Sequence, residues 1–321
     1  MRLAAIQPPR LRTAEEGGDR SATWLELFYD LVFVVAVAVL GIRLIADTSW
    51  TGLASYLGYF VALWWLWASF TFYADRYDTD DLVYRLLAVG QIVAIALLAA
   101  SISSGPAGST TAFALAYAAA RIVLILMYER VRRHVPETRV LVTGYIKGFT
   151  VGAAIWLISA FVPEPFRFFL WAIALAVEFA TPYIMRREQA KVPLDVSHLP
   201  ERFGLFTILV LGESIAAVVA GLGGLGWELA PTLTAALGVV VATGMWWMYF
   251  DNLEGSVVRR RADQAKAWRP TVWIYSHLPL AAGVAITGVG LEHAVFEAGE
   301  DHAHTASRWL LVGAEIGRAH V

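Results

Sequence analysis

The sequence predicts an all-α fold, a polytopic bundle of membrane-spanning helices. Nine apolar segments are long enough to cross a bilayer, for which a helix needs about 20 residues. Hydrophobic residues make up 58% of the chain and charged residues only 16%, and the mean hydropathy is +0.58. Soluble domains contain about 25% charged residues. A soluble core of 321 residues could not bury this apolar excess.

Turn-forming residues separate the expected spans. A Ser/Gly/Pro cluster runs from Ser103 to Ser109, and Pro163 and Pro165 mark a second turn. A tenth apolar segment begins near Arg308. The nine full spans are expected at residues 25–45, 52–74, 82–104, 109–128, 141–162, 166–185, 202–222, 231–250 and 271–292.

The placement of Lys and Arg predicts the orientation of the helices. Basic residues concentrate in the N-terminal tail and in every second loop, whereas the opposite loops hold only Arg43, Arg167 and Arg308. Loops rich in Lys and Arg stay in the cytoplasm. We therefore expect a multi-pass protein with a cytoplasmic N-terminus.

The chain divides into three parts. Residues 1–22 are polar, lack the apolar core of a signal peptide, and are expected to form a solvated cytoplasmic tail. Residues 23–314 form the transmembrane helical domain. Residues 315–321 have the sequence of a translated sequencing adapter, so we expect this segment to be non-native and the second half of the protein to be truncated.

Two pairs of segments suggest an internal repeat. The first and seventh spans both open with Glu-x-Phe, at Glu26 and Glu201. The second and eighth spans both carry a Trp pair and then an aromatic residue followed by Asp, at Asp75 and Asp251. The six-span offset predicts two parallel halves, as in some transporters. Alternatively, Trp and Tyr only mark the membrane interface.

Ionisable residues inside the spans are the candidates for a transport or ion pathway, because such groups are costly in a membrane and often functional. Acids and bases nearly balance, so they could share one polar cavity, which costs less than scattered charges. The same charges could instead serve packing alone. The candidates are Glu26, Asp30, Arg121, Lys147, Glu178, Glu213 and His277.

Glu213 is the strongest candidate. It lies eleven residues after Arg202, which is about 16 Å along a helix and close to the middle of the membrane. The small residues Gly212 and Ser214 would let another helix or a water molecule approach closely. The alternative is a protonated or ion-paired glutamate that only helps packing.

Four other candidates have plain structural alternatives. Glu26 and Asp30 share one helix face, but an acid in the first turn can simply cap the helix, which suits Glu26 better than the deeper Asp30. Arg121 and Glu178 are each expected about two turns from the cytoplasmic end, where they could extend toward water.

Lys147 and His277 complete the set. Lys147 adjoins a stripe of small residues, Gly144, Gly148 and Gly152, which is typical of a helix-packing face. Lys147 could therefore pair across that contact or extend its charged group inward. His277 precedes Pro279, which would kink the helix and widen a cavity. A histidine satisfied by packing is the alternative.

Several kinds of chemistry are absent from the sequence. There is no cysteine, no phosphate-binding loop, no HExxH and no nucleophile elbow, so no catalytic residue and no cofactor are expected. The net charge of -2 gives no reason to expect a nucleic-acid partner. The acidic, His-rich segment from Glu292 to His304 matches no zinc spacing, and we expect a solvated outer loop without a metal.

Residues 26–33 and 201–215 together resemble the two hallmark segments of the bacterial low temperature requirement protein A (LtrA) family. The resemblance covers residues 24 to 314 and implies an integral protein of the bacterial cytoplasmic (inner) membrane. It implies no molecular activity, because none is established for the family. The motif positions are Glu26, Phe28, Asp30, Phe33, Glu201, Phe203, Gly204, Gly212, Glu213 and Ser214.

These observations favour a secondary transporter or ion-conducting protein that carries an ion or a small charged solute through the lipid bilayer. Asp30 and Glu213 would be equivalent acids in the two halves. One alternative is a non-transporting membrane protein that supports cold growth or envelope physiology through lipid or partner contacts. Another is an intramembrane enzyme acting on a lipid-linked substrate.

Overall fold

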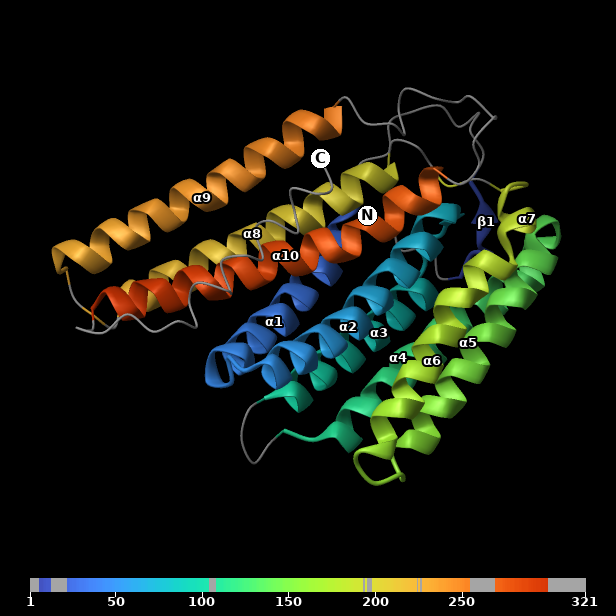
Figure 1. The fold of residues 1–321 in the computed structure, drawn as a ribbon. Coiled ribbons are helices and arrows are strands. Elements are labelled where there is room, and N and C mark those ends of the chain that lie inside the picture. The colour runs from blue at the N-terminus through green and yellow to red at the C-terminus, as the bar shows by residue number, and fades with distance from the viewer. Residues whose placement is uncertain are drawn as a thin grey trace. The chain divides into compact units, whose positions relative to one another are not determined.

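A computed structural model shows a chain built from long helices (Figure 1). Among the described residues, nine helices are long and apolar enough to cross a membrane, which confirms the predicted polytopic helical bundle. The start of the tenth segment and most of the N-terminal tail lie outside the described residues. The structure describes residues 6–12, 22–103, 108–192, 194, 198–223, 225, 227–254 and 269–299.

The helices follow the predicted spans to within about four residues at each end, with two larger exceptions. α4 continues to His134 rather than residue 128, and α10 continues to Ala298 rather than residue 292. The long helices are α1 Trp24–Ala46, α2 Trp50–Arg76, α3 Leu82–Ile102, α4 Thr110–His134, α5 Arg139–Ser159, α6 Phe166–Ile184, α8 His198–Gly223, α9 Leu229–Glu254 and α10 Arg269–Ala298. The short elements are the 3-10 turn Pro136–Thr138, α7 Arg186–Gln189, and the paired strands β1 Arg10–Leu11 and β2 Tyr77–Asp78.

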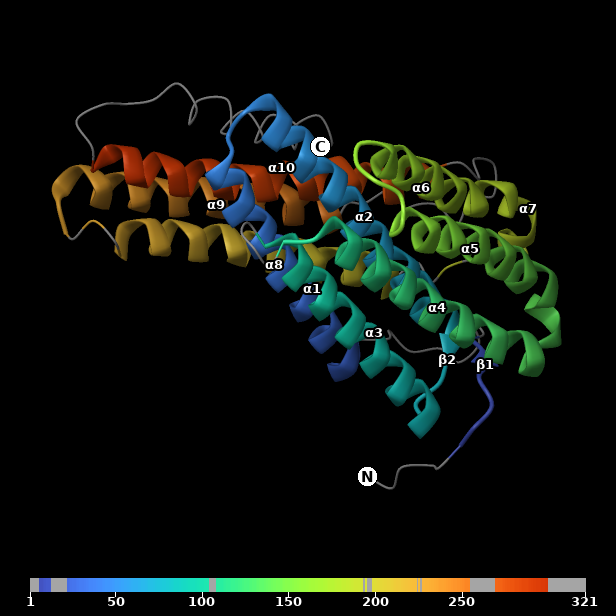
Figure 2. The same cartoon turned by 90° about the horizontal axis from the view of Figure 1, so that it is seen from below.

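The chain forms two compact units, and their boundaries fall inside α1, inside α2 and near the start of α8. The first unit contains residues 1–36 and 65–199, and the second contains residues 37–64 and 200–321. In the first unit, α3 packs on α4, α4 on α5 and α5 on α6 (Figure 2). In the second unit, α9 packs on α10. The core of that second unit includes a buried cluster of Val218, Ala235, Leu291 and Val295.

The glycine stripe on α5 is a packing face, as the sequence predicted. A Cβ atom on Gly152 would lie 2.6 Å from Glu178 Oε1, and one on Gly148 would overlap the Thr181 side chain. A Cβ atom on Gly144 would overlap Met185 at the end of α6. The missing side chains therefore let α6 approach α5 closely.

Arg167, at the start of α6, closes the end of α5. Its Nε donates to the Ser159 and Val162 carbonyls at 3.0 and 3.1 Å, and its Nη2 donates to the Ala160 carbonyl at 3.2 Å. The last carbonyls of a helix have no partner within the helix. This buried cation therefore satisfies them and complements the helix dipole.

The internal repeat stays a prediction. Trp67 on α2 donates from Nε1 to Asp30 on α1 at 2.8 Å. Trp247 on α9 instead donates to Asp251 of its own helix and is exposed. Trp65, the second member of the Trp pair on α2, is also buried and stacks on Phe179 with ring centroids 4.1 Å apart. The two Trp pairs therefore make different contacts, and the exposed Trp247 suits the membrane interface.

The turn between α2 and α3 is bound to α4 and to the N-terminal arm. Asp81 Oδ1 caps α3 by accepting from the Tyr84 amide at 2.9 Å. Arg130 donates to both Asp81 oxygens, at 2.9 and 2.6 Å, and the Gln7 amide donates to Oδ2 at 3.0 Å. Burial raises the pKa of Asp81, but the bonds from Arg130, Tyr84 and Gln7 outweigh burial and hold the pKa below its usual value.

We expect Gly148→Ala to destabilise the fold by about 1–3 kcal/mol, because the added methyl group overpacks the contact with α6. Thermal unfolding in detergent, followed by tryptophan fluorescence, measures the change. Gly58→Ala is the matched control, because a Cβ atom there meets nothing within 4 Å. Equal melting temperatures for the two variants would contradict the close packing of α5 on α6.

We expect Asp81→Asn to lower the free energy of unfolding at neutral pH by weakening the bonds to Arg130 and Gln7. The folded pKa of Asp81 is lowered, so the stabilisation is complete above the unfolded pKa of about 3.9 and is lost as the pH falls through the folded value. Chemical unfolding between about pH 7 and about pH 2.5 should therefore show the wild type and the variant converging in acid. A gap that widens in acid would contradict the assignment.

Candidate functional site

The carboxylate of Glu26 caps α1. The Thr23 amide donates to Glu26 Oε2 at 2.7 Å, and the Glu26 amide donates to Thr23 Oγ1 at 3.3 Å. This reciprocal pair is a capping box. The structural alternative for Glu26 is therefore present, although the side chain is also fully buried and faces a histidine.

That histidine is His198, which sequence reasoning missed. Its Nδ1 lies 2.9 Å from Asp75 Oδ1 and its Nε2 lies 3.7 Å from Glu26 Oε2, and all three side chains are buried. The predicted seventh span began at Arg202, which left His198 in a loop, whereas α8 begins at His198 itself. An imidazole between two carboxylates can hold a proton on either ring nitrogen.

Asp30 lies one turn deeper on α1. It is fully buried and accepts the hydrogen bond from Trp67 Nε1. Tyr29 stacks on Phe70 with ring centroids 4.0 Å apart and contacts Phe33 at 5.1 Å. Tyr29, Asp30 and Phe33 thus face the interior of the first unit, whereas the motif residue Phe28 is exposed.

Arg121 and Glu178 form an ion pair inside the first unit. Arg121 Nη2 lies 2.6 Å from Glu178 Oε2, and neither side chain is exposed. The Tyr117 hydroxyl donates to Glu178 at 2.8 Å and accepts from Arg121 at 2.9 Å. The Arg121 guanidinium also lies 4.9 Å from the centre of the Phe149 ring.

The expectation that Arg121 and Glu178 extend toward water near a helix end is therefore wrong. α4 runs six residues beyond its predicted end of 128, to His134, so Arg121 lies in the middle of the helix. A charge at that depth is stable only with a partner inside the protein. Glu178 supplies that partner at 2.6 Å.

Lys147 and His277 do not join this pair. Lys147 is exposed and forms no ion pair with any described residue, so the expected pairing across the helix contact is wrong. His277 is buried, with Nδ1 bonded to the Trp273 carbonyl at 2.7 Å and Nε2 3.0 Å from the Tyr249 hydroxyl. These bonds leave Nε2 as an acceptor, which favours the packing interpretation of His277.

The second hallmark segment lies on α8, and its residues face different ways. Phe203 packs its ring against His277 at 4.9 Å and Trp273 at 5.2 Å. Ser214 is buried against α10, where a Cβ atom on Gly288 would overlap it. A Cβ atom on Gly212 meets nothing within 4 Å. Close approach between the helices at this level is therefore made by Gly288 against Ser214, and no described residue approaches Gly212.

Of the other motif positions, Gly204 is buried and Glu201 is partly exposed. Both lie in the first two turns of α8, before the deeper Glu213.

A second carboxylate, which the sequence analysis placed in a loop, lies on the helix that packs against α8 next to Glu213. Glu292 is on α10, one turn after Gly288, and Gly288 packs against Ser214, the residue that follows Glu213. Both are half-buried, and neither forms an ion pair with any Lys, Arg or His among the described residues. The assignment of Glu292 to a solvated loop was wrong because α10 continues to Ala298.

The rest of the predicted acidic loop is divided. His293 and Glu297 also lie on α10, with Nε2 of the histidine 3.4 Å from Oε1 of the glutamate. Residues 300–304 lie outside the described part of the chain. Within the described part, no group of three or more His, Cys, Asp or Glu side chains is arranged to hold a metal ion.

These features define a polytopic helical membrane protein that carries ionisable side chains within its spans. Residues 21–316 match the family described as bacterial low temperature requirement A protein (LtrA), and the chain belongs to this family. This match confirms the resemblance in the two hallmark segments.

A similar protein is an uncharacterized protein of Rhizobium meliloti (strain 1021). It is 29% identical over 293 residues, which cover 86% of this chain and 70% of that protein. No solved structure matches the chain.

We expect Glu178→Gln to lower the free energy of unfolding by about 3–5 kcal/mol, because it leaves the buried Arg121 charge without a counter-charge. The double variant Arg121→Met with Glu178→Leu should recover most of this loss, because it buries no charge. Unfolding in detergent micelles measures both variants. A double variant less stable than Glu178→Gln would show that the pair contributes more than mutual neutralisation.

Proposed function

We propose that this chain moves protons or small cations across the bacterial cytoplasmic membrane, as a secondary transporter or an ion-conducting protein. Glu213 and Glu292 are the proposed ion-binding groups. The observation that carries the proposal is their arrangement: two half-buried carboxylates on the packed helices α8 and α10, with no described cation paired to either. The proposed transport converts no substrate into a product, so the proposed role is not that of an enzyme.

The chemistry follows from the cost of charge in a membrane. Two nearby carboxylates in an apolar setting do not readily ionise together, so one of them takes up a proton or the two share a cation. Uptake and release of that ion change the charge of the pair by one unit. Such a change can be linked to the movement of a second solute or can itself be the transported charge.

The position of the pair along the helices suits an entry path. Glu292 lies six residues before the end of α10 at Ala298, which is about 9 Å along the axis. Glu213 lies ten residues before the end of α8 at Gly223, or about 15 Å. With a cytoplasmic N-terminus, both of these helix ends would face the outer side, so Glu292 would meet the incoming ion first.

The contrast with Arg121 and Glu178 supports this assignment. In the first unit a buried glutamate is neutralised by an arginine and by a tyrosine hydroxyl. Glu213 has neither kind of partner among the described residues. The cost of placing a charge in the membrane is therefore offset at Glu178 by a fixed counter-charge. We propose that at Glu213 an exchangeable ion offsets this cost.

The test is ion flux into liposomes that contain the reconstituted protein and a trapped pH dye, with potassium flux followed in parallel. We expect Glu213→Gln and Glu292→Gln each to reduce flux at least about 10-fold, because positioned proton-transfer groups contribute about 10²–10⁴ in rate. Glutamine keeps the shape of the side chain but cannot exchange a proton.

Glu228→Gln is the matched control, because Glu228 is exposed just before α9 and should leave flux unchanged. Full flux in both glutamine variants would exclude Glu213 and Glu292 as ion-binding groups. No flux in the wild type, together with a lower melting temperature of Glu213→Gln, would favour the non-transporting alternative.

A further inference from the structure

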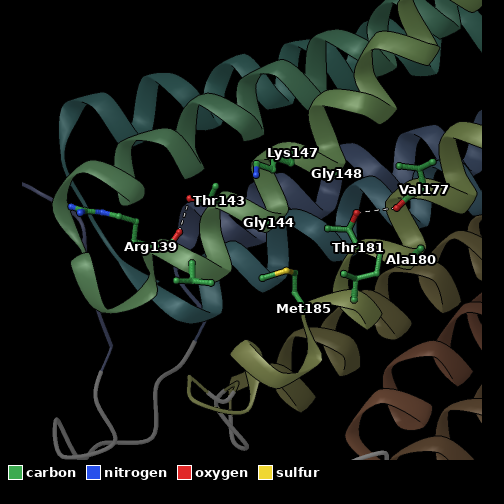
Figure 3. Close-up of a pocket in the computed structure, with 11 residues that line it drawn as sticks. Arg139, Thr143, Gly144, Lys147, Gly148, Val177, Ala180, Thr181 and Met185 are labelled. Carbon is green, nitrogen blue, oxygen red and sulfur yellow. Dashed lines mark hydrogen bonds between the residues drawn. The ribbon is translucent and has the colours of Figure 1, made fainter.

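A groove separates α5 from α6 on one face of the first unit. It encloses about 680 Å³ and is shown in Figure 3, where Arg139, Thr143 and Lys147 follow one another along α5 and Met185 lies opposite Gly144. We call it the α5–α6 groove. Its lining residues are Arg139, Val140, Thr143, Gly144, Lys147, Gly148, Val177, Ala180, Thr181, Ile184 and Met185.

The charge of the α5–α6 groove is of one sign. Arg139 and Lys147 are its only ionisable lining residues, and no carboxylate is among them. Both cations are exposed, and neither is ion-paired to a described residue. Glu178, the nearest acid along α6, is already bonded to Arg121 and Tyr117 and faces Gly152 instead.

The depth of Lys147 makes this arrangement costly without an anion. Lys147 follows Arg139 by eight residues, which places it about 12 Å further into the span. A lysine at that depth extends its ammonium group toward the headgroup region, which lies at the Arg139 end of the groove. An anion held between the two cations would satisfy both.

The remaining wall of the groove is apolar. Ile184, Ala180 and Val177 follow one another along α6 from the level of Gly144 to that of Gly152, and Ile184 is 69% exposed, as expected of a side chain facing lipid. Arg186 and Arg187 continue the positive charge past the end of α6. A site with cations at its mouth and an apolar wall fits an amphiphile with an anionic head and a hydrocarbon tail.

We propose that the α5–α6 groove binds one phospholipid with an anionic headgroup. The phosphate lies between Arg139 and Lys147, and an acyl chain lies along Val177, Ala180 and Ile184. The glycines at 144 and 148 form the floor, because any side chain there would meet α6. This site is independent of the carboxylate pair on α8 and α10, and its occupancy does not require ion transport.

The test is lipid binding to the full chain in detergent, measured by native mass spectrometry with added phosphatidylglycerol. Lys147→Gln should weaken binding about fivefold, as expected for the loss of one basic residue near an anionic lipid surface. Lys191→Gln is the matched control, since Lys191 lies outside the groove and is paired with Glu188. Phosphatidylcholine should bind wild type and Lys147→Gln equally.

A second measurement locates the acyl chain and identifies other occupants. A phosphatidylglycerol with a photoactivatable acyl chain should label the peptide containing Val177, Ala180 and Ile184, and Ala180→Trp should suppress that labelling. Equal lipid affinity in wild type and Lys147→Gln would overturn the proposal. Binding of glycerol phosphate as tight as that of the lipid, or a Lys147→Gln change in oligomeric mass alone, would overturn it in favour of a free anion or of a second copy.

Discussion

The close contact of α5 with α6 at the Arg121–Glu178 ion pair is the constraint on which the first unit depends. Gly152 leaves room for the Glu178 carboxylate, which reaches Arg121 on α4 through that space. Tyr117 bonds both charges and stacks on Trp156 with ring centroids 4.0 Å apart. The helices α4, α5 and α6 therefore all meet at this ion pair. No water is available at that depth to replace either charged group.

The same constraint separates charges that are neutralised within the chain from charges that are not. Arg121, Glu178 and Arg167 each have fixed partners that neutralise a charge or complete a helix end. Glu213 and Glu292 lack such a cation among the described residues, and Lys147 points a charge into a groove without an acid. A charge that the fold does not neutralise must be met by something from outside the chain, which is why both proposals concern these residues.

The sequence predicted the spans well, because membrane crossing depends on a local property, the length of an apolar run. The sequence also predicted the glycine stripe of α5, because the spacing of small residues along one helix is likewise a local property. The partners of the charged residues were harder to predict, since pairing depends on how each helix is rotated. Arg121 with Glu178 and Ser214 with Gly288 are contacts between distant parts of the sequence.

Errors at helix ends had a different origin. Glu292 and His198 were missed because polar residues at the edge of an apolar run are typical of a loop, yet α10 and α8 include them. A helical turn of polar residues is stable there when side chains supply the bonds that water would otherwise make. The i, i+4 spacing of His293 and Glu297 could have predicted that α10 continues through these residues, because such a pair lies on one face of a helix.

The bond from Trp67 to Asp30 gives the protein an internal optical probe. The indole of Trp67 is fully buried and its ring nitrogen is held 2.8 Å from a carboxylate oxygen of the first hallmark segment. Indole emission responds to the charge and polarity around the ring. A change in the charge of Asp30 is therefore expected to change the fluorescence of Trp67. Events at this segment can thus contribute to the fluorescence of the protein inside a membrane, together with the signal of its other twelve tryptophans.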